Sequence, residues 1–152
     1  MQNQTIDNLD KRIINALIAD ARTSYAELAK QFKVSPATIH VRIEKLKTAG
    51  IITGTHMAVD AKKLGYDVCC FIGINLQSAG DYPEVIAELE QINEVVEAYY
   101  TTGQYSVLIK IMTHSIEDLQ WLLIDKIQAI DKVQATETLI SLQTPIHKSI
   151  QL

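Results

Sequence analysis

Apolar side chains in the first twenty residues recur at the spacing of one helical face. They follow Asp7 and Asp10, whose carboxylates suit the amino end of a helix because they cap free amides and complement its positive dipole. The apolar positions are Ile13, Ile14, Leu17 and Ile18. The pattern therefore predicts an amphipathic helix in this segment.

Two more short helices are predicted between Tyr25 and Gly50, a glycine that suits a left-handed stop. The first buries a face made of Tyr25, Leu28, Ala29 and Phe32. The second starts at Ser35-Pro36, because a serine hydroxyl caps free amides and the fixed φ of proline suits the first helical position. Its inward stripe consists of Ile39, Ile43 and Leu46. Such a pair is typical of a helix-turn-helix, which places its second helix in DNA.

The outward face of that second helix combines small and basic side chains. Small residues let the backbone approach base edges, and basic residues neutralise phosphates. The segment from Lys30 to Lys47 holds five Lys or Arg residues against one acid, Glu44. We therefore predict contacts to double-stranded DNA from Ser35, Ala37, Thr38, His40, Val41, Arg42 and Lys45. A solvated helical pair in some other small domain is the alternative.

The turn between these helices lacks the glycine that helix-turn-helix units usually place there. Lys33 occupies the position instead. A side chain in the left-handed region costs about 1 kcal/mol relative to glycine. We predict that Lys33 adopts a positive φ and strains the turn.

From Ile51 onward the chain alternates between the periods of strands and helices. The weak alternation from Ile51 to Val59 suits a strand or wing, and Lys62 to Gly65 suits a connector. In the order strand, helix, strand, strand, helix, strand, the remaining elements are Val68 to Leu76, Tyr82 to Ile92, Val95 to Thr102, Tyr105 to Met112, Ser115 to Ile130 and Gln134 to Leu142. This βαββαβ order predicts a ferredoxin-like fold.

The predicted class is therefore α+β. We expect a winged-helix-like, three-helix helix-turn-helix domain at residues 1–52, a connecting strand or linker at 53–66, and the βαββαβ domain at 67–152. Both helices of the latter cover one sheet face, and the strands carry too many apolar residues on the other face for a monomer. We expect a homodimer formed through this sheet, with a partly palindromic DNA site.

Charge is distributed unevenly, although the net charge is −4. Residues 1–60 hold 8 Lys/Arg and 6 Asp/Glu, which gives +2, and residues 61–152 hold 6 and 12, which gives −6. A weakly basic DNA-facing domain beside an acidic one fits these values. The amino terminus is polar and the longest apolar run, Val68 to Ile74, is too short to cross a bilayer. We expect a cytoplasmic protein without a membrane partner.

No arrangement of residues indicates catalysis. The histidines form no HExxH pair and have no short spacing to cysteine, and the nucleophile elbow, Walker loop and dinucleotide fingerprint are absent from the sequence. Cys69 and Cys70 lie in an apolar run and are interpreted as small buried hydrophobes in a reducing compartment. We expect no enzymatic activity, no metal and no cofactor.

The turn after the second predicted strand concentrates polar groups. Gly103 permits a sharp turn, and the backbone amides gathered there could hold the carboxylate, ammonium and amide of a small amino acid. Hydroxyls on one side of the last strand could line the same pocket. The candidate ligand-binding residues are Tyr100, Thr101, Thr102, Gly103, Gln104, Tyr105, Ser106, Thr136 and Thr138. An ordinary hairpin is the alternative interpretation.

The sequence resembles the Lrp/AsnC, or feast/famine, family of transcription regulators over essentially its whole length. The leading motifs are IDNLDKRIINALIADARTSYAELAKQF, SPATIHVRIEKLKTAGII, TTGQYSVLIKI and TETLISL. The segment DYPEVIAELEQINEVVEAYYTTGQYS is closest to the asparagine-responsive branch. Many relatives carry Gly-x-Tyr-Asp where this chain has Gly103-Gln104-Tyr105-Ser106, a departure from leucine-type recognition.

The resemblance implies an amino-terminal DNA-binding domain and a carboxy-terminal domain for ligand binding and oligomerisation. It implies dimers that assemble into octamers, with the effector amino acid between dimers near residues 101–106. L-asparagine is the implied effector, and control of asparagine metabolism is the implied role. The alternative function is an amino-acid-binding regulatory module that acts through protein partners.

Overall fold

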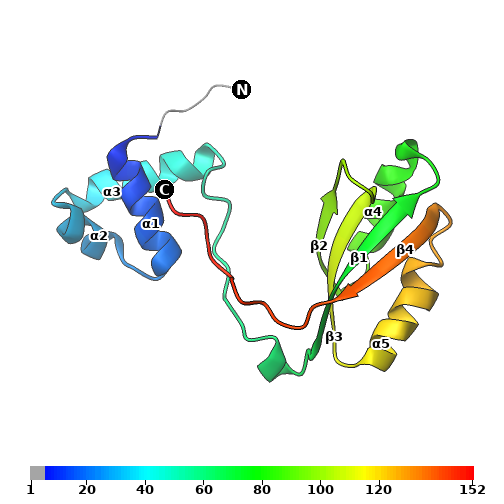
Figure 1. The fold of residues 1–152 in the computed structure, drawn as a ribbon. Coiled ribbons are helices and arrows are strands. Elements are labelled where there is room, and N and C mark those ends of the chain that lie inside the picture. The colour runs from blue at the N-terminus through cyan, green and yellow to red at the C-terminus, as the bar shows by residue number, and fades with distance from the viewer. Residues whose placement is uncertain (1–5) are drawn as a thin grey trace. The chain divides into compact units, whose positions relative to one another are not determined.

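The computed structural model describes residues 6–152, so the first five residues of the expected 1–52 domain lie outside it. The chain divides into two compact units. The amino-terminal unit runs to Ala58 and includes Ile146–Leu152, and the carboxy-terminal unit is Val59–Pro145. The expected α+β class, a helix-turn-helix domain and a ferredoxin-like domain, is confirmed (Figure 1).

The carboxy-terminal tail departs from the expected boundaries. The sequence places residues 146–152 in the 67–152 domain, whereas in the structure they join the amino-terminal unit. The Asn15 side-chain amide donates to the carbonyl of Leu152 at 2.8 Å and accepts from its N–H at 3.1 Å. A contact across 137 residues leaves no mark in local periodicity.

Local capping interactions start each helix of the amino-terminal unit: α1 (Asn8–Ala19), α2 (Tyr25–Phe32) and α3 (Pro36–Thr48). Asp7 and Asp10 form a reciprocal capping box at α1, and Ser24 and Glu27 form another at α2. The inward residues predicted from spacing form the core: Ile13, Leu28, Ala29, Ile39 and Ile43. Lys33 lies in the left-handed region with φ 57°, which confirms the predicted positive φ.

The expected wing is not formed. Residues 51–60, all of which the structure describes, contain no strand, and only a short 3-10 helix, Lys62–Leu64, precedes Gly65. Weak alternation of polar and apolar residues does not make a strand unless a neighbouring strand supplies hydrogen bonds. Residues 51–60 therefore form an extended connector.

The carboxy-terminal unit contains β1 (Val68–Leu76), α4 (Tyr82–Glu90), β2 (Val95–Tyr100), β3 (Val107–Thr113), α5 (Ile116–Trp121) and β4 (Val133–Ile140). The strands pair antiparallel in the order β2-β3-β1-β4 (Figure 1). The single helix expected from Ser115 to Ile130 instead changes after α5 to a π-helix, Leu122–Ile127.

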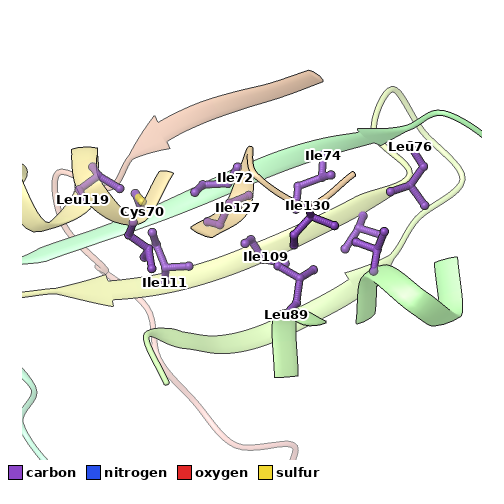
Figure 2. Close-up of a cluster of buried hydrophobic side chains, with 13 residues drawn as sticks. Cys70, Ile72, Ile74, Leu76, Leu89, Ile109, Ile111, Leu119, Ile127 and Ile130 are labelled. Carbon is purple, nitrogen blue, oxygen red and sulfur yellow. The ribbon is translucent and has the colours of Figure 1, made fainter. Parts of the chain in front are cut away.

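Alternate residues of β1 and β3 point toward α4 and α5 and form the core. Figure 2 shows Ile72, Ile74 and Ile109 packed against side chains from the helices, including Leu89 and Leu119. We call this side of the sheet the helix face and the other side the open face. Because successive side chains of a strand point to opposite faces, the position of a polar residue along its strand decides which face it reaches.

Candidate DNA-binding surface and effector site

The outward side of α3 forms an open hollow of about 520 Å³. It is lined by Asp7, Ala37, Thr38, Val41, Arg42 and Lys45. Val41 is 65% exposed, although it is a large apolar residue. The structure thus brings five of the seven predicted DNA-contacting residues together on one surface, and adds Asp7, which the sequence reasoning did not include.

The two predicted residues outside the hollow have other contacts. The Ser35 hydroxyl accepts a hydrogen bond from the Thr38 N–H at 3.1 Å and therefore caps α3. It also lies 2.8 Å from the Thr38 hydroxyl. The exposed ring of His40 lies 5.6 Å, centroid to centroid, from that of Tyr25. Ser35 thus sets where α3 begins, and this fixes which side chains face outward.

Arg42, which the sequence predicts as a DNA contact, already makes ion pairs within its own domain. Its Nη1 donates to Asp7 at 2.6 Å and to Asp10 at 2.8 Å. The hydrogen bonds that Arg42 donates, first to Asp10 and then to Asp7, raise the pKa of Arg42. The pKa of Asp7 is lowered, first by the Asp10 N–H and then by Arg42. Asp10, in the first turn of α1, is only 3% exposed. A buried carboxylate needs a cationic partner, and Arg42 supplies it.

Lys45 differs from the other basic residues of α3. Lys47 pairs with Glu44 at 2.8 Å, and Arg42 pairs with the two aspartates. Within residues 6–152 the exposed Lys45 side chain makes no ion pair. It is thus the cation of α3 most available to a phosphate.

The second candidate site is the loop between β2 and β3. The Thr101 N–H donates to the Ser106 carbonyl at 3.0 Å, its hydroxyl donates to the Tyr105 carbonyl at 2.5 Å, and the Ser106 N–H donates to Ile74 at 2.9 Å. Gly103 does not have the positive φ that would explain a glycine requirement, and a Cβ there would meet no atom within 4 Å. The sharp turn predicted from Gly103 therefore does not depend on glycine.

Tyr105 belongs to this loop, and its ring lies on the open face of the sheet. A Cβ added to Gly73 would lie 2.5 Å from two carbons of the Tyr105 ring, so the ring covers Gly73 closely. The Tyr105 hydroxyl donates to the Glu137 carboxylate, and this hydrogen bond raises the pKa of Tyr105. Sequence reasoning missed Glu137 as a site residue because its proximity to Tyr105 depends on strand register.

Three of the predicted ligand residues, Thr136, Thr138 and Tyr100, lie on the helix face instead. Thr136 and Thr138 pair with Ile74 and Ile72, which point into the core, and residues directly opposite in an antiparallel sheet share a face. Thr136 accepts from the side chain of Gln128 at 2.9 Å. Tyr100 also points to the helix face, where its ring lies 4.3 Å from that of Tyr82. The structure therefore separates these residues from Tyr105 by the thickness of the sheet.

Neither a metal-binding cluster nor a membrane-spanning helix is present among residues 6–152. In that range no cluster of three or more His, Cys, Asp or Glu side chains could hold a metal ion. None of the helices described is long and apolar enough to span a membrane. Burial raises the pKa of the Cys70 thiol to about 11, which makes it a poor nucleophile at neutral pH.

Family comparisons assign both halves of the chain. Residues 6–47 match the AsnC-type helix-turn-helix domain, and residues 69–150 match the Lrp/AsnC ligand binding domain. The chain is 63% identical over 151 residues to Regulatory protein AsnC of Escherichia coli strain K12, covering 99% of each protein. It is 60% identical over 146 residues to Regulatory protein AsnC of Haemophilus influenzae, covering 96% of this chain and 97% of that protein.

Solved structures agree with these matches. The structure of E. coli AsnC superposes with a TM-score of 0.91 at 64% identity and covers 96% of this chain and 98% of that one. A transcriptional regulator of Neisseria meningitidis, crystallised as an L-Met complex, shares the fold with a TM-score of 0.89 at 21% identity, covering 95% of each chain.

Proposed function

This chain belongs to the Lrp/AsnC family of transcriptional regulators, and on that premise we propose that its effector is L-asparagine and that it controls promoters of asparagine metabolism. Its helix-turn-helix domain binds DNA and its carboxy-terminal domain binds an amino acid. Since it acts on promoters, we place it in the cytoplasm with the chromosome.

The proposed DNA contact is made by α3. Its hollow combines small and apolar side chains, Ala37 and Val41, with the polar Thr38. Such a surface admits base edges and thymine methyl groups, while Lys45 is available to a phosphate. Ser35 and His40 flank this surface at the start and side of the helix. Protomers related by a two-fold axis would present two such helices to a partly palindromic site.

The neutral chemistry of the 101–106 loop carries the proposal of asparagine. Its side chains are two threonines, a glutamine, a tyrosine and a serine, none of them charged. The amide of asparagine both donates and accepts hydrogen bonds and has no charge, so hydroxyl and amide partners suit it. A leucine side chain would need an apolar pocket, and an aspartate side chain would need a cation.

The two charged ends of a free amino acid also find partners near this loop. The backbone N–H groups of Thr102, Gly103, Gln104 and Tyr105 donate to no group within residues 6–152. They are available to a carboxylate. Glu137, beside the Tyr105 hydroxyl, offers a carboxylate to an ammonium group. The open space at Gly103 leaves room for a ligand or a neighbouring subunit.

We further propose a homodimer through the open face and assembly of dimers into an octamer. Tyr99 and Leu139 lie on this face and are 51% and 49% exposed. Exposed apolar side chains on a sheet face indicate an interface. Sedimentation at micromolar concentration should give a multiple of 17.0 kDa, and a monomer would contradict the assembly.

The test of function combines calorimetry with DNA binding by the full chain. Asparagine should give a saturable heat signal that aspartate, glutamine and leucine do not reproduce. It should also change the affinity for promoter fragments selected by the protein, and a tenfold change corresponds to about 1.4 kcal/mol of coupling. Asparagine binding without salt-sensitive affinity for any duplex would favour a module that acts through protein partners.

A further inference from the structure

The guanidinium of Arg42 uses only one of its three nitrogens for hydrogen bonds within residues 6–152. Both of its ion pairs use Nη1, which donates to Oδ2 of Asp7 at 2.6 Å and to Oδ1 of Asp10 at 2.8 Å. Within residues 6–152 neither Nε nor Nη2 donates a hydrogen bond. A guanidinium carries five N–H donors in a rigid plane, so one pair of parallel donors along the Nε–Nη2 edge is still available.

The two aspartates are themselves fixed by the backbone of α1. Asp7 accepts from the Asp10 N–H through Oδ1 at 2.9 Å, and Asp10 accepts from the Asp7 N–H through Oδ2 at 3.1 Å. Each carboxylate thus uses one oxygen for the helix cap and the other for Arg42. The position of Nη1 is therefore set by the main chain at the start of α1 rather than by mobile side chains.

The charge of this triad argues against a phosphate partner. Two carboxylates and one guanidinium sum to −1, and Asp7 and Arg42 both line the hollow of α3. A phosphate that approached Arg42 would also approach Asp7, whose side chain is 52% exposed. A base edge offers acceptors without a full charge, and guanine O6 and N7 match two parallel donors.

We infer that Asp7 and Asp10 are positioning residues that orient Arg42 so that its Nε–Nη2 edge contacts one guanine in the major groove. The inference rests on the proposed DNA-binding role of α3 and assigns its base specificity. Lys45 makes the phosphate contact on the same face. An arginine already ordered in the free protein loses less conformational freedom on binding, which favours the matching base.

The test uses duplexes selected from a random pool by the wild-type protein, with single-base variants, over a series of salt concentrations. Asp7→Asn keeps the shape of the side chain and removes its charge at a half-exposed position, so the fold should survive; a thermal melt checks this. It should reduce discrimination at one G·C pair about tenfold and raise affinity for unrelated DNA. Arg42→Lys should lose discrimination at the same pair without changing the salt dependence.

Lys45→Gln is the matched control, because it should weaken binding to all duplexes and lower the salt slope by about 1. The double variant Asp7→Asn with Arg42→Lys should discriminate no less than Arg42→Lys alone, since both changes act on one contact. Equal weakening on all duplexes by Arg42→Lys, or an Asp7→Asn protein with unchanged specificity, would overturn the positioning role. Wild-type protein without salt-sensitive DNA affinity would overturn the proposed function as well.

Discussion

The amino-terminal and carboxy-terminal units place their functional residues by different means. In the amino-terminal unit, the surface of α3 follows from caps and apolar spacings that lie within a few residues of one another. In the carboxy-terminal unit, Gly73, Tyr105 and Glu137 meet only because β1 and β4 pair in register and the loop before β3 places Tyr105 over them. Most of the α3 surface is thus set within one helix, whereas Arg42 is held by partners from another segment, Asp7 and Asp10.

A further difference lies in how each unit uses its charges. Arg42 and the aspartates connect α3 to α1 through a compact ion-pair cluster. In the carboxy-terminal unit the loop 101–106 is uncharged, and the Tyr105 hydroxyl donates to the Glu137 carboxylate. The surface of α3 therefore includes a charge cluster, whereas the 101–106 loop itself offers only neutral hydrogen-bonding groups.

The largest effect should come from Gly73→Ala. The added Cβ would lie 2.5 Å from the Tyr105 ring, so the ring or β1 must move, at a cost of about 2 kcal/mol in the free energy of unfolding. Urea denaturation measures this cost, and calorimetry should show loss of effector binding.

Gly103→Ala is the matched control for this change. It has open space around the new Cβ and no positive φ, so it should alter stability by less than about 0.5 kcal/mol. In a Tyr105→Ala background, Gly73→Ala should become nearly neutral. An equal cost with and without the tyrosine ring would show that close packing of Tyr105 on Gly73 is not the cause.

These two glycines also show what sequence can and cannot reveal. Sequence predicted the three amino-terminal helices, the βαββαβ order and the positive φ of Lys33, because caps, spacings and turn residues act locally. It singled out Gly103 as the glycine that permits the turn, whereas the steric requirement lies at Gly73, under the Tyr105 ring. Pairings such as Tyr105 with Glu137 span 32 residues and depend on a register that no local pattern contains.

Long-range pairing also decides which face the two threonines reach and which partners Arg42 finds. Alternation separates Thr136 and Thr138 from Glu137, yet only pairing with β1 decides which of them faces the helices. The acids in the first turn of α1 were correctly predicted as caps. Their second role, toward Arg42, joins residues 32 and 35 positions apart and became visible only in the folded chain.

The next largest effect should come from Arg42→Gln. This change leaves the carboxylate of Asp10, which is 3% exposed, without its cationic partner, and should cost about 1 to 2 kcal/mol of unfolding free energy. Lys47→Gln removes an exposed pair on the same helix and should change stability by less than about 0.5 kcal/mol. Similar losses from both variants would mean that the cluster with Arg42 is no more stabilising than a surface ion pair.

A smaller change of opposite sign is expected for Lys33→Gly. The residue has φ 57°, which glycine adopts without the steric cost of a side chain, so stability should rise by about 1 kcal/mol. The melting temperature should increase by a few degrees. Lys30→Gly, an exposed change inside α2, should lower it by a similar amount. If Lys33→Gly left the melting temperature unchanged, the turn would not be strained.

The smallest expected effect is the contribution of the Asp7 charge to stability, which should disappear at acid pH. Because the pKa of Asp7 is lowered in the folded protein, its contribution to stability is complete above the ordinary value of 3.8 and is lost as the pH falls through the lowered folded value. Asp7→Asn should therefore be less stable than the wild type at neutral pH, and the difference should shrink below about pH 3.8. Denaturant midpoints at several pH values measure this convergence, and a constant difference would assign the loss to the cap rather than to the charge.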